Sequence, residues 1–240
     1  MERIDDLGVK NLKIIQDTDL FCFGMDAVLL SNFAKASGGD VVVDLCSGNG
    51  IIPILLTAKT TAKKIYGVEL QKKPYDLALR SIELNGISDR VEMINDDIKN
   101  VFLHIGEGKV NAVTCNPPYM TGGVGKINPN DTVAVARHEI TTNLDEVVHI
   151  ASRLLKFGGN FFMVHRADRL CDIMCEMRNH HIEPKRIRFV HPRVNASPNL
   201  ILIEGKSGGK PGIIIENPLY VYNDDGTYTD EINKIYEREI

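Results

Sequence analysis

Apolar residues follow two alternating patterns along most of the chain. Short β-branched or apolar runs predict strands at 40–45, 64–70, 91–95, 110–115, 160–165, 185–191 and 199–204. Stretches with helical spacing predict helices at 24–36, at 51–59, from Pro74 to Asn85, from Asn143 to the Gly158–Gly159 pair, at 167–180 and at 228–240. Strands that alternate with such helices form a mostly parallel sheet with helices on both faces. The last two strands are separated by a short turn, so we expect them to pair antiparallel. The pattern thus predicts an α/β fold whose mostly parallel, seven-stranded sheet has an antiparallel edge strand.

The length of 240 residues fits one α/β domain that spans 1–240. No apolar run approaches the roughly 20 residues that a membrane span needs, and Glu2, Asp5 and Asp6 argue against a signal peptide. We therefore expect a cytoplasmic protein with no membrane partner.

The five cysteines form no CxxC pair, which argues against a disulfide framework and against a zinc ribbon. Cys171 and Cys175 lie four residues apart in a predicted helix. Because a free cysteine behaves as a small apolar residue, we interpret these two as part of a buried helix face and expect no metal site.

The net charge of −4 hides an uneven distribution. The segment from Arg153 to Arg193 holds 9 Lys or Arg against 4 Asp or Glu, a balance of +5, so the rest of the chain has a balance of −9. A local positive face can bind phosphates in an acidic protein, because screening limits distant charges to about 10 Å. Arg166, Arg186 and Arg188 in this segment are candidate substrate contacts, although an ordinary solvated surface has the same composition.

A glycine-rich turn follows the first predicted strand, where open α/β sheets bind nucleotides. Glu69 ends the second strand, where a carboxylate can accept hydrogen bonds from ribose hydroxyls, and Asp97 follows the third, in reach of an adenine amine. The turn lacks the third glycine of dinucleotide sites, and Asp44 would repel pyrophosphate but attract the ammonium group of methionine. These features favour S-adenosylmethionine as cofactor. The candidate cofactor-binding residues of this edge are Asp44, Ser47, Gly48, Asn49, Gly50, Glu69, Leu70, Asp96, Asp97 and Ile98.

Asn116, Pro117, Pro118 and Tyr119 directly follow the fourth predicted strand and are the candidate catalytic residues. Two prolines fix the backbone and lack N–H donors. The side-chain oxygen of Asn116 and the carbonyl of Pro117 can therefore accept the two hydrogens of an exocyclic amine and favour its charged transition state. Tyr119 can stack on the base that carries the amine, a contact typically worth about 1 to 3 kcal/mol.

This series of residues resembles class I methyltransferases that modify exocyclic amino groups. The match extends to Phe23 to Leu30, which is similar to an upstream cofactor motif that contains Asp26, and to Arg137 and His138 after the catalytic turn. Over nearly the whole chain, the sequence resembles bacterial tRNA adenine-N6 methyltransferases that modify the adenosine beside the anticodon of a valine tRNA. The resemblance implies a Rossmann-like sheet, S-adenosylmethionine as donor and tRNA as partner. We expect a monomer in which 1–36 covers the cofactor, and 120–142 forms a substrate loop with Arg137 and His138 as substrate contacts.

The turn at Asn116 does not identify the amine. Enzymes that methylate guanine N2, adenine N6 of DNA or a glutamine of release factors resemble it too. A non-catalytic RNA-binding factor with an intact cofactor pocket is a further alternative.

Overall fold

The computed structural model describes residues 1–20, 22–118 and 144–238. Its helices are α1 to α4 and α6 to α8, with two short 3-10 helices: α1 (Met25–Phe33), α2 (Ile51–Lys59), α3 (Lys72–Leu84), η1 (Ile98–Asn100), α4 (Val101–Ile105), α6 (Leu144–Leu154), η2 (Ala167–Arg169), α7 (Leu170–Asn179) and α8 (Asp230–Ile235). Its strands are β1 (Glu2–Asp6), β2 (Lys13–Asp17), β3 (Val41–Leu45), β4 (Lys64–Glu69), β5 (Val91–Asn95), β6 (Val110–Cys115), β7 (Leu155–Arg166), β8 (Ile182–His191), β9 (Leu200–Ser207), β10 (Ile214–Ile215) and β11 (Leu219–Tyr220).

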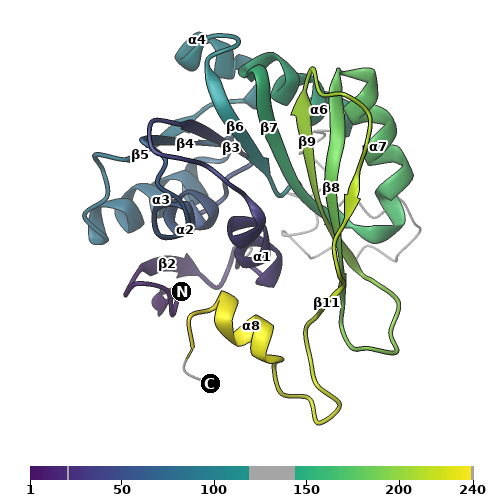
Figure 1. Ribbon diagram of the computed structural model, residues 1–240. Coiled ribbons are helices and arrows are strands. Elements are labelled where there is room, and N and C mark those ends of the chain that lie inside the picture. Colours follow the sequence, from purple (N-terminus) through teal and green to yellow (C-terminus); the bar gives the residue numbers. More distant parts are fainter. Residues whose placement is uncertain (21, 119–143, 239–240) are drawn as a thin grey trace, which may run out of the picture.

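The main sheet has nine strands in the order β10-β8-β9-β7-β6-β3-β4-β5, with β11 also paired to β8 (Figure 1). The strands from β7 to β5 are parallel to one another, whereas β9 runs antiparallel to both β7 and β8. The predicted fold class is therefore confirmed, with two differences. The two-residue strands β10 and β11 extend the sheet beyond the seven predicted strands, and the antiparallel strand β9 lies inside the sheet instead of at its edge.

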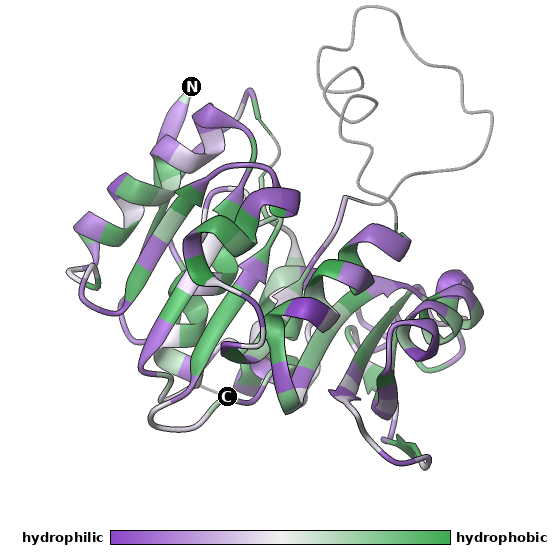
Figure 2. Cartoon of the chain, turned by 90° about the horizontal axis from the view of Figure 1, so that it is seen from above, coloured by the Kyte–Doolittle hydropathy of each residue, from purple (hydrophilic) through white to green (hydrophobic). Residues whose placement is uncertain are grey.

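Two apolar layers cover the sheet. Val42 and Phe162 belong to the cluster that packs against α1, α2, α3 and α8, and their chain neighbours Val43 and Phe161 belong to the cluster under α4, α6 and α7. This follows from strand geometry, because successive side chains point to opposite faces. Strands in the middle of the sheet are mostly hydrophobic, and polar residues gather on the outer helices (Figure 2). No helix of the described residues combines the length and the apolar character that a membrane crossing requires.

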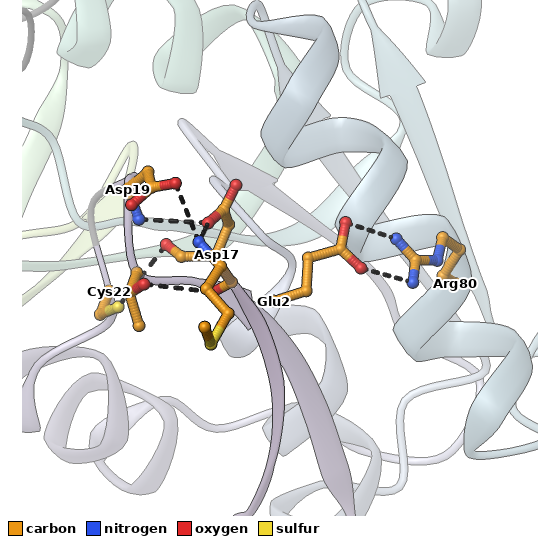
Figure 3. A network of polar contacts seen from close by, with 7 residues as sticks. Glu2, Asp17, Asp19, Cys22 and Arg80 are labelled. Atoms are coloured by element: carbon orange, nitrogen blue, oxygen red, sulfur yellow. Dashed lines mark hydrogen bonds and ion pairs between the residues drawn. The ribbon is translucent and has the colours of Figure 1, made fainter.

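An N-terminal hairpin of β1 and β2, which the sequence analysis missed, lies against α3. The backbone N–H of Ile15 donates to Ser81 Oγ at 2.9 Å, and Arg80 donates two hydrogen bonds to Glu2. The N-terminal ammonium group donates to Asp17 and Asp19 at the open end of the hairpin, where Glu2 pairs with Asp17 (Figure 3). Within the segment 1–36, the hairpin therefore packs on α3, and α1 packs on α2 and β7.

Two predicted boundaries and one predicted burial were wrong. The helix before Gly158 ends at Leu154, and β7 already begins at Leu155 and contains both glycines. The last predicted helix shortens to α8 within the described residues. Cys171 and Cys175 are exposed, because α7 turns Ile173 and Met177 toward the core instead.

Candidate active site

The carboxyl ends of β3, β4, β5 and β6 meet at one edge of the sheet, since these strands are parallel. The two glycines of the turn after β3 have different surroundings. Gly48 has a φ of +55°, and a side-chain carbon placed there would have no atom within 4 Å, so the space above it is open to a ligand. Gly50 has a φ of +80°, and such a carbon would lie 2.9 Å from the Ala78 side chain, so this glycine lets α2 begin close to α3.

Asp44 is fully buried beneath this turn and serves as an acceptor within the fold. Its Oδ2 accepts a hydrogen bond from Ser47 Oγ at 2.6 Å, and its Oδ1 accepts one from Thr114 Oγ1 at 2.7 Å. Burial raises the pKa of Asp44 to about 7, against the two hydrogen bonds, which lower it. Asp44 therefore ties the turn after β3 to β6, and Thr114 is a partner that the sequence analysis did not identify.

Glu69, at the end of β4, also holds the glycine turn. Its Oε2 accepts from the Gly48 backbone N–H at 2.8 Å, and its Oε1 accepts from the Gln71 N–H at 2.8 Å. Burial raises the pKa of this carboxyl group. Because an ionised carboxylate offers about four acceptor positions, Glu69 retains capacity for a ligand hydroxyl.

The two aspartates after β5 differ in their surroundings. Asp96 accepts hydrogen bonds from Asn100 and contacts His104 Nε2 at 2.9 Å, and this contact with His104 is the main cause that lowers the pKa of Asp96. Asp97 accepts from the Lys99 backbone N–H at 3.0 Å and caps the short helix η1. Asp96 is thus committed to the fold of the following turn, and Asp97, with the buried Ile98 beside it, is the better cofactor candidate.

Asn116 lies directly after β6 and contacts the start of α1. Its Nδ2 donates to Asp26 Oδ2 at 3.0 Å, and Asp26 Oδ1 accepts from the backbone N–H of Ala27 at 2.9 Å. Pro117 is buried and Pro118 half-buried. Asp26 was predicted to bind the cofactor, and its carboxylate faces Asn116 in the turn after β6, a contact between residues 90 positions apart.

Upstream of Asp26, the hairpin holds the chain in place. Gln16 is buried in β2, and its Oε1 accepts from the Phe23 backbone N–H at 3.1 Å. The sequence signal for this buried amide was weak, since only Ile14 and Ile15 of β2 are apolar and the strand itself was not predicted.

Two of the three arginines predicted to bind substrate pair with carboxylates inside the fold. Arg186 donates to Glu204, Glu216 and the Phe33 carbonyl, and its side chain is 12% exposed. Arg188 donates to both oxygens of Glu231 and is 16% exposed. Both guanidinium groups are committed within the fold and are not retained as substrate contacts.

Arg166 differs from these two. It ends β7 at the edge that carries Asn116, and it pairs with Asp168 while its side chain stays 42% exposed. It therefore remains a candidate contact. Tyr119, Arg137, His138 and the predicted loop 120–142 lie outside the described residues.

A cluster with metal-ligating groups lies between α6 and α7. Asp145, Glu176 and His180 bring ligand atoms within 4.8 Å of one another, and His180 Nε2 lies 2.6 Å from Asp145 Oδ1. Asp145 is exposed and the other two residues are half-buried, and we interpret the cluster as a polar contact that joins the two helices.

The amino-acid sequence matches known methyltransferases. Residues 31–123 match the family model of the TRM5/TYW2 methyltransferase domain. The chain is 25% identical to the tRNA1(Val) (adenine(37)-N6)-methyltransferase of Porphyromonas gingivalis, over 83% of this chain and 80% of that protein. It is 22% identical to the enzyme of the same name from Dyadobacter fermentans, over 92% of this chain and 90% of that protein.

Solved structures give the same fold. A predicted O-methyltransferase from Agrobacterium tumefaciens superimposes with a TM-score of 0.72 at 19% identity, over 89% of this chain and 96% of that one. TYW2 of P. horikoshii, solved in complex with MeSAdo, superimposes with a TM-score of 0.59 at 14% identity, over 87% and 72% of the two chains. The chain is therefore similar in sequence to the bacterial tRNA1(Val) (adenine(37)-N6)-methyltransferases and has a fold shared with methyltransferases solved in complex with AdoMet or its analogues.

Proposed function

We propose that this protein transfers the methyl group of S-adenosylmethionine to the exocyclic N6 amine of an adenosine in tRNA, the adenosine beside the anticodon of a valine tRNA. The names of the relatives, from two bacteria, support this substrate. We further propose that it works as a monomer in the cytoplasm.

The residues at the sheet edge fit S-adenosylmethionine. The open space at Gly48 admits a ligand close to the backbone, and Glu69 and Asp97 are the carboxylates that would accept from ribose hydroxyls and from the adenine amine. Leu70 is half exposed beside Glu69 and offers an apolar contact. Ser47, Asn49 and Gly50 complete the turn. Asp44 has no exposed surface for a direct contact, so we assign it the role of holding this turn.

The orientation of Asn116 is the observation that carries the proposal. Because its Nδ2 donates to the Asp26 carboxylate, the amide has a defined orientation, in which Nδ2 faces Asp26 and Oδ1 lies on the other side of the amide group. An amide oxygen accepts hydrogen bonds, as the N–H groups of an exocyclic amine require. We assign Asp26 the role of a positioning residue for Asn116.

The chemistry needs little from the protein beyond this positioning. S-adenosylmethionine, when bound, supplies a methyl group activated by the adjacent sulfonium. The lone pair of an aromatic amine is delocalised, so acceptors that hold both N–H groups favour the pyramidal nitrogen that develops positive charge. Asn116 Oδ1 and the Pro117 carbonyl would be these acceptors. The proton of the methylated nitrogen is acidic and leaves to solvent, so no strong general base is needed.

Labelled S-adenosylmethionine offered with total tRNA or with release factor tests the proposal. We expect label in tRNA with the wild type and its loss with Asn116→Ala, while the cofactor Kd stays within about twofold. Asn179→Ala, an exposed asparagine on α7, is the matched control and should keep full activity. Label in release factor, or an active Asn116→Ala, would contradict the proposal.

A further inference from the structure

A hollow of about 400 Å³ lies between the end of β7 and the start of β9. Its lining consists of Arg166, Asp168, Pro198, Asn199 and Leu200. Arg166 and Leu200 are partners in the antiparallel register of these two strands. A second hollow, around Gly158, lies at the opposite edge of the sheet. The first hollow therefore shares the edge of the catalytic turn.

The sheet register places this hollow near Asn116. Cys115, the last residue of β6, pairs with Met163. Extending this register by one residue sets Asn116 level with Val164, and Arg166 lies two residues further along β7. With strands about 4.8 Å apart and a rise of about 3.3 Å per residue, the backbones of Asn116 and Arg166 are about 8 Å apart. A stacked nucleic-acid strand covers about 3.4 Å per nucleotide, and an unstacked one covers more. The hollow therefore lies one or two nucleotides from a base held at Asn116.

The lining has the groups that recognise an unpaired base. Arg166 donates from Nε to Asp168 Oδ1 at 3.2 Å and from Nη2 to Oδ2 at 2.5 Å, so its flat guanidinium group is fixed in orientation. Pro198 and Leu200 add apolar surface. Sequence-specific RNA-binding proteins stack splayed bases on such arginine planes and read the base edges with polar side chains.

Asn199 is positioned for this reading. Its backbone N–H donates to the Val190 carbonyl at 3.1 Å, and its own carbonyl accepts from the Ala167 N–H at 3.1 Å. Its backbone is therefore tied to β8 and to the start of η2, directly after β7, while the side chain is exposed. An amide side chain offers both a donor and an acceptor to a base edge.

We propose that this hollow binds the nucleobase next to the target adenosine, with Arg166 as the stacking group and Asn199 as the group that contacts the base edge. The inference rests on the proposed function, since it requires an RNA substrate whose target base lies at Asn116. It adds a substrate subsite that selects for an unpaired neighbour of the target.

The test uses synthetic anticodon stem–loops in which the nucleotide on the 5′ or the 3′ side of the target adenosine is abasic. With the wild type, we expect one of the two abasic loops to lose about 5- to 150-fold in kcat/KM relative to the intact loop, the range for one base stack. Arg166→Ala and Asn199→Ala, made singly, should lower kcat/KM on the intact loop and lose much of the abasic penalty. Arg178→Ala is the matched control. Arg178 is an exposed residue of α7 that pairs with Glu183 of β8, and it lies outside the hollow.

The outcomes separate the two proposals. A wild type that methylates the intact loop but is indifferent to both abasic loops overturns the hollow as a subsite. The same holds if both variants retain the full abasic penalty, which would leave the Arg166–Asp168 pair a purely structural contact. A wild type that methylates neither stem–loop nor tRNA overturns the proposed function, and this inference with it. Asn199→Ala removes an exposed side chain only, so it gives a reading even if Arg166→Ala fails to fold.

Discussion

Replacement of Asp26 by asparagine separates the two roles that this residue has been given. Asparagine keeps an acceptor for the Ala27 N–H, so the start of α1 should be retained, but it removes the charged acceptor for Asn116 Nδ2. A hydrogen bond to a charged group contributes about 1.5 to 3 kcal/mol. If that energy holds the Asn116 amide in its reactive direction, its loss should lower the methyl-transfer rate by about 10- to 150-fold, at 1.36 kcal/mol per tenfold.

The assay is the single-turnover rate at saturating tRNA and S-adenosylmethionine, together with the Kd of the cofactor. We expect the rate to fall by that factor, with a cofactor Kd within about twofold of the wild type. Asp225→Asn is the matched control, because Asp225 is an exposed carboxylate that accepts from Thr227 in the turn before α8. A weakened cofactor Kd with an unchanged saturated rate would refute the positioning role and restore Asp26 to the cofactor site.

Three further predictions concern the fold around the site. Burial raises the pKa of Asp44 from 3.8 to about 7, so the folded state holds a proton that the unfolded chain releases between these values. Its contribution to stability is present below pH 4 and is lost as the pH rises to about 7, which changes the free energy of unfolding by about 4 kcal/mol. Asp44→Asn should remove this pH dependence from the unfolding profile. A variant with the same pH profile as the wild type would contradict this. Arg186→Ala leaves Glu204 and Glu216 without their cationic partner and should lower the free energy of unfolding in urea by about 3 kcal/mol, with an unchanged Kd for tRNA. A weaker affinity for tRNA would instead support Arg186 as a substrate contact. Arg80→Ala breaks only an exposed pair with Glu2, so the melting temperature should stay unchanged within error, and a clear drop would show that the hairpin depends on this pair.

Local sequence signals predicted the strands and turns that carry the site. Gly48 and Gly50 have positive φ angles, and two consecutive prolines restrict φ after β6, so both turns carry local signals in the sequence. The bounds predicted for β5 and β6 from their apolar runs agree with the observed ones, because these runs are also local signals.

Features that depend on distant partners were not predictable from single segments. Arg186 and Arg188 read as a basic surface, because their carboxylate partners Glu204, Glu216 and Glu231 lie 18 to 43 residues further along the chain. The contact between Asp26 and Asn116 spans 90 residues.

The N-terminal hairpin escaped detection for another reason. Most side chains of β1 are exposed, so this strand carries no apolar pattern. The Gly158–Gly159 pair was predicted to end a helix, because glycine is common at helix ends. Both glycines instead lie inside β7, at an irregularity in its pairing with β6.

Mass spectrometry of nucleosides from digested tRNA, after incubation with the wild type and S-adenosylmethionine, identifies the methylated atom itself. We expect N6-methyladenosine, mapped to the adenosine beside the anticodon of valine tRNA, and no such product with Asn116→Ala. A methyl group on guanine N2, on another position of the base, or on no nucleoside would contradict the proposed function.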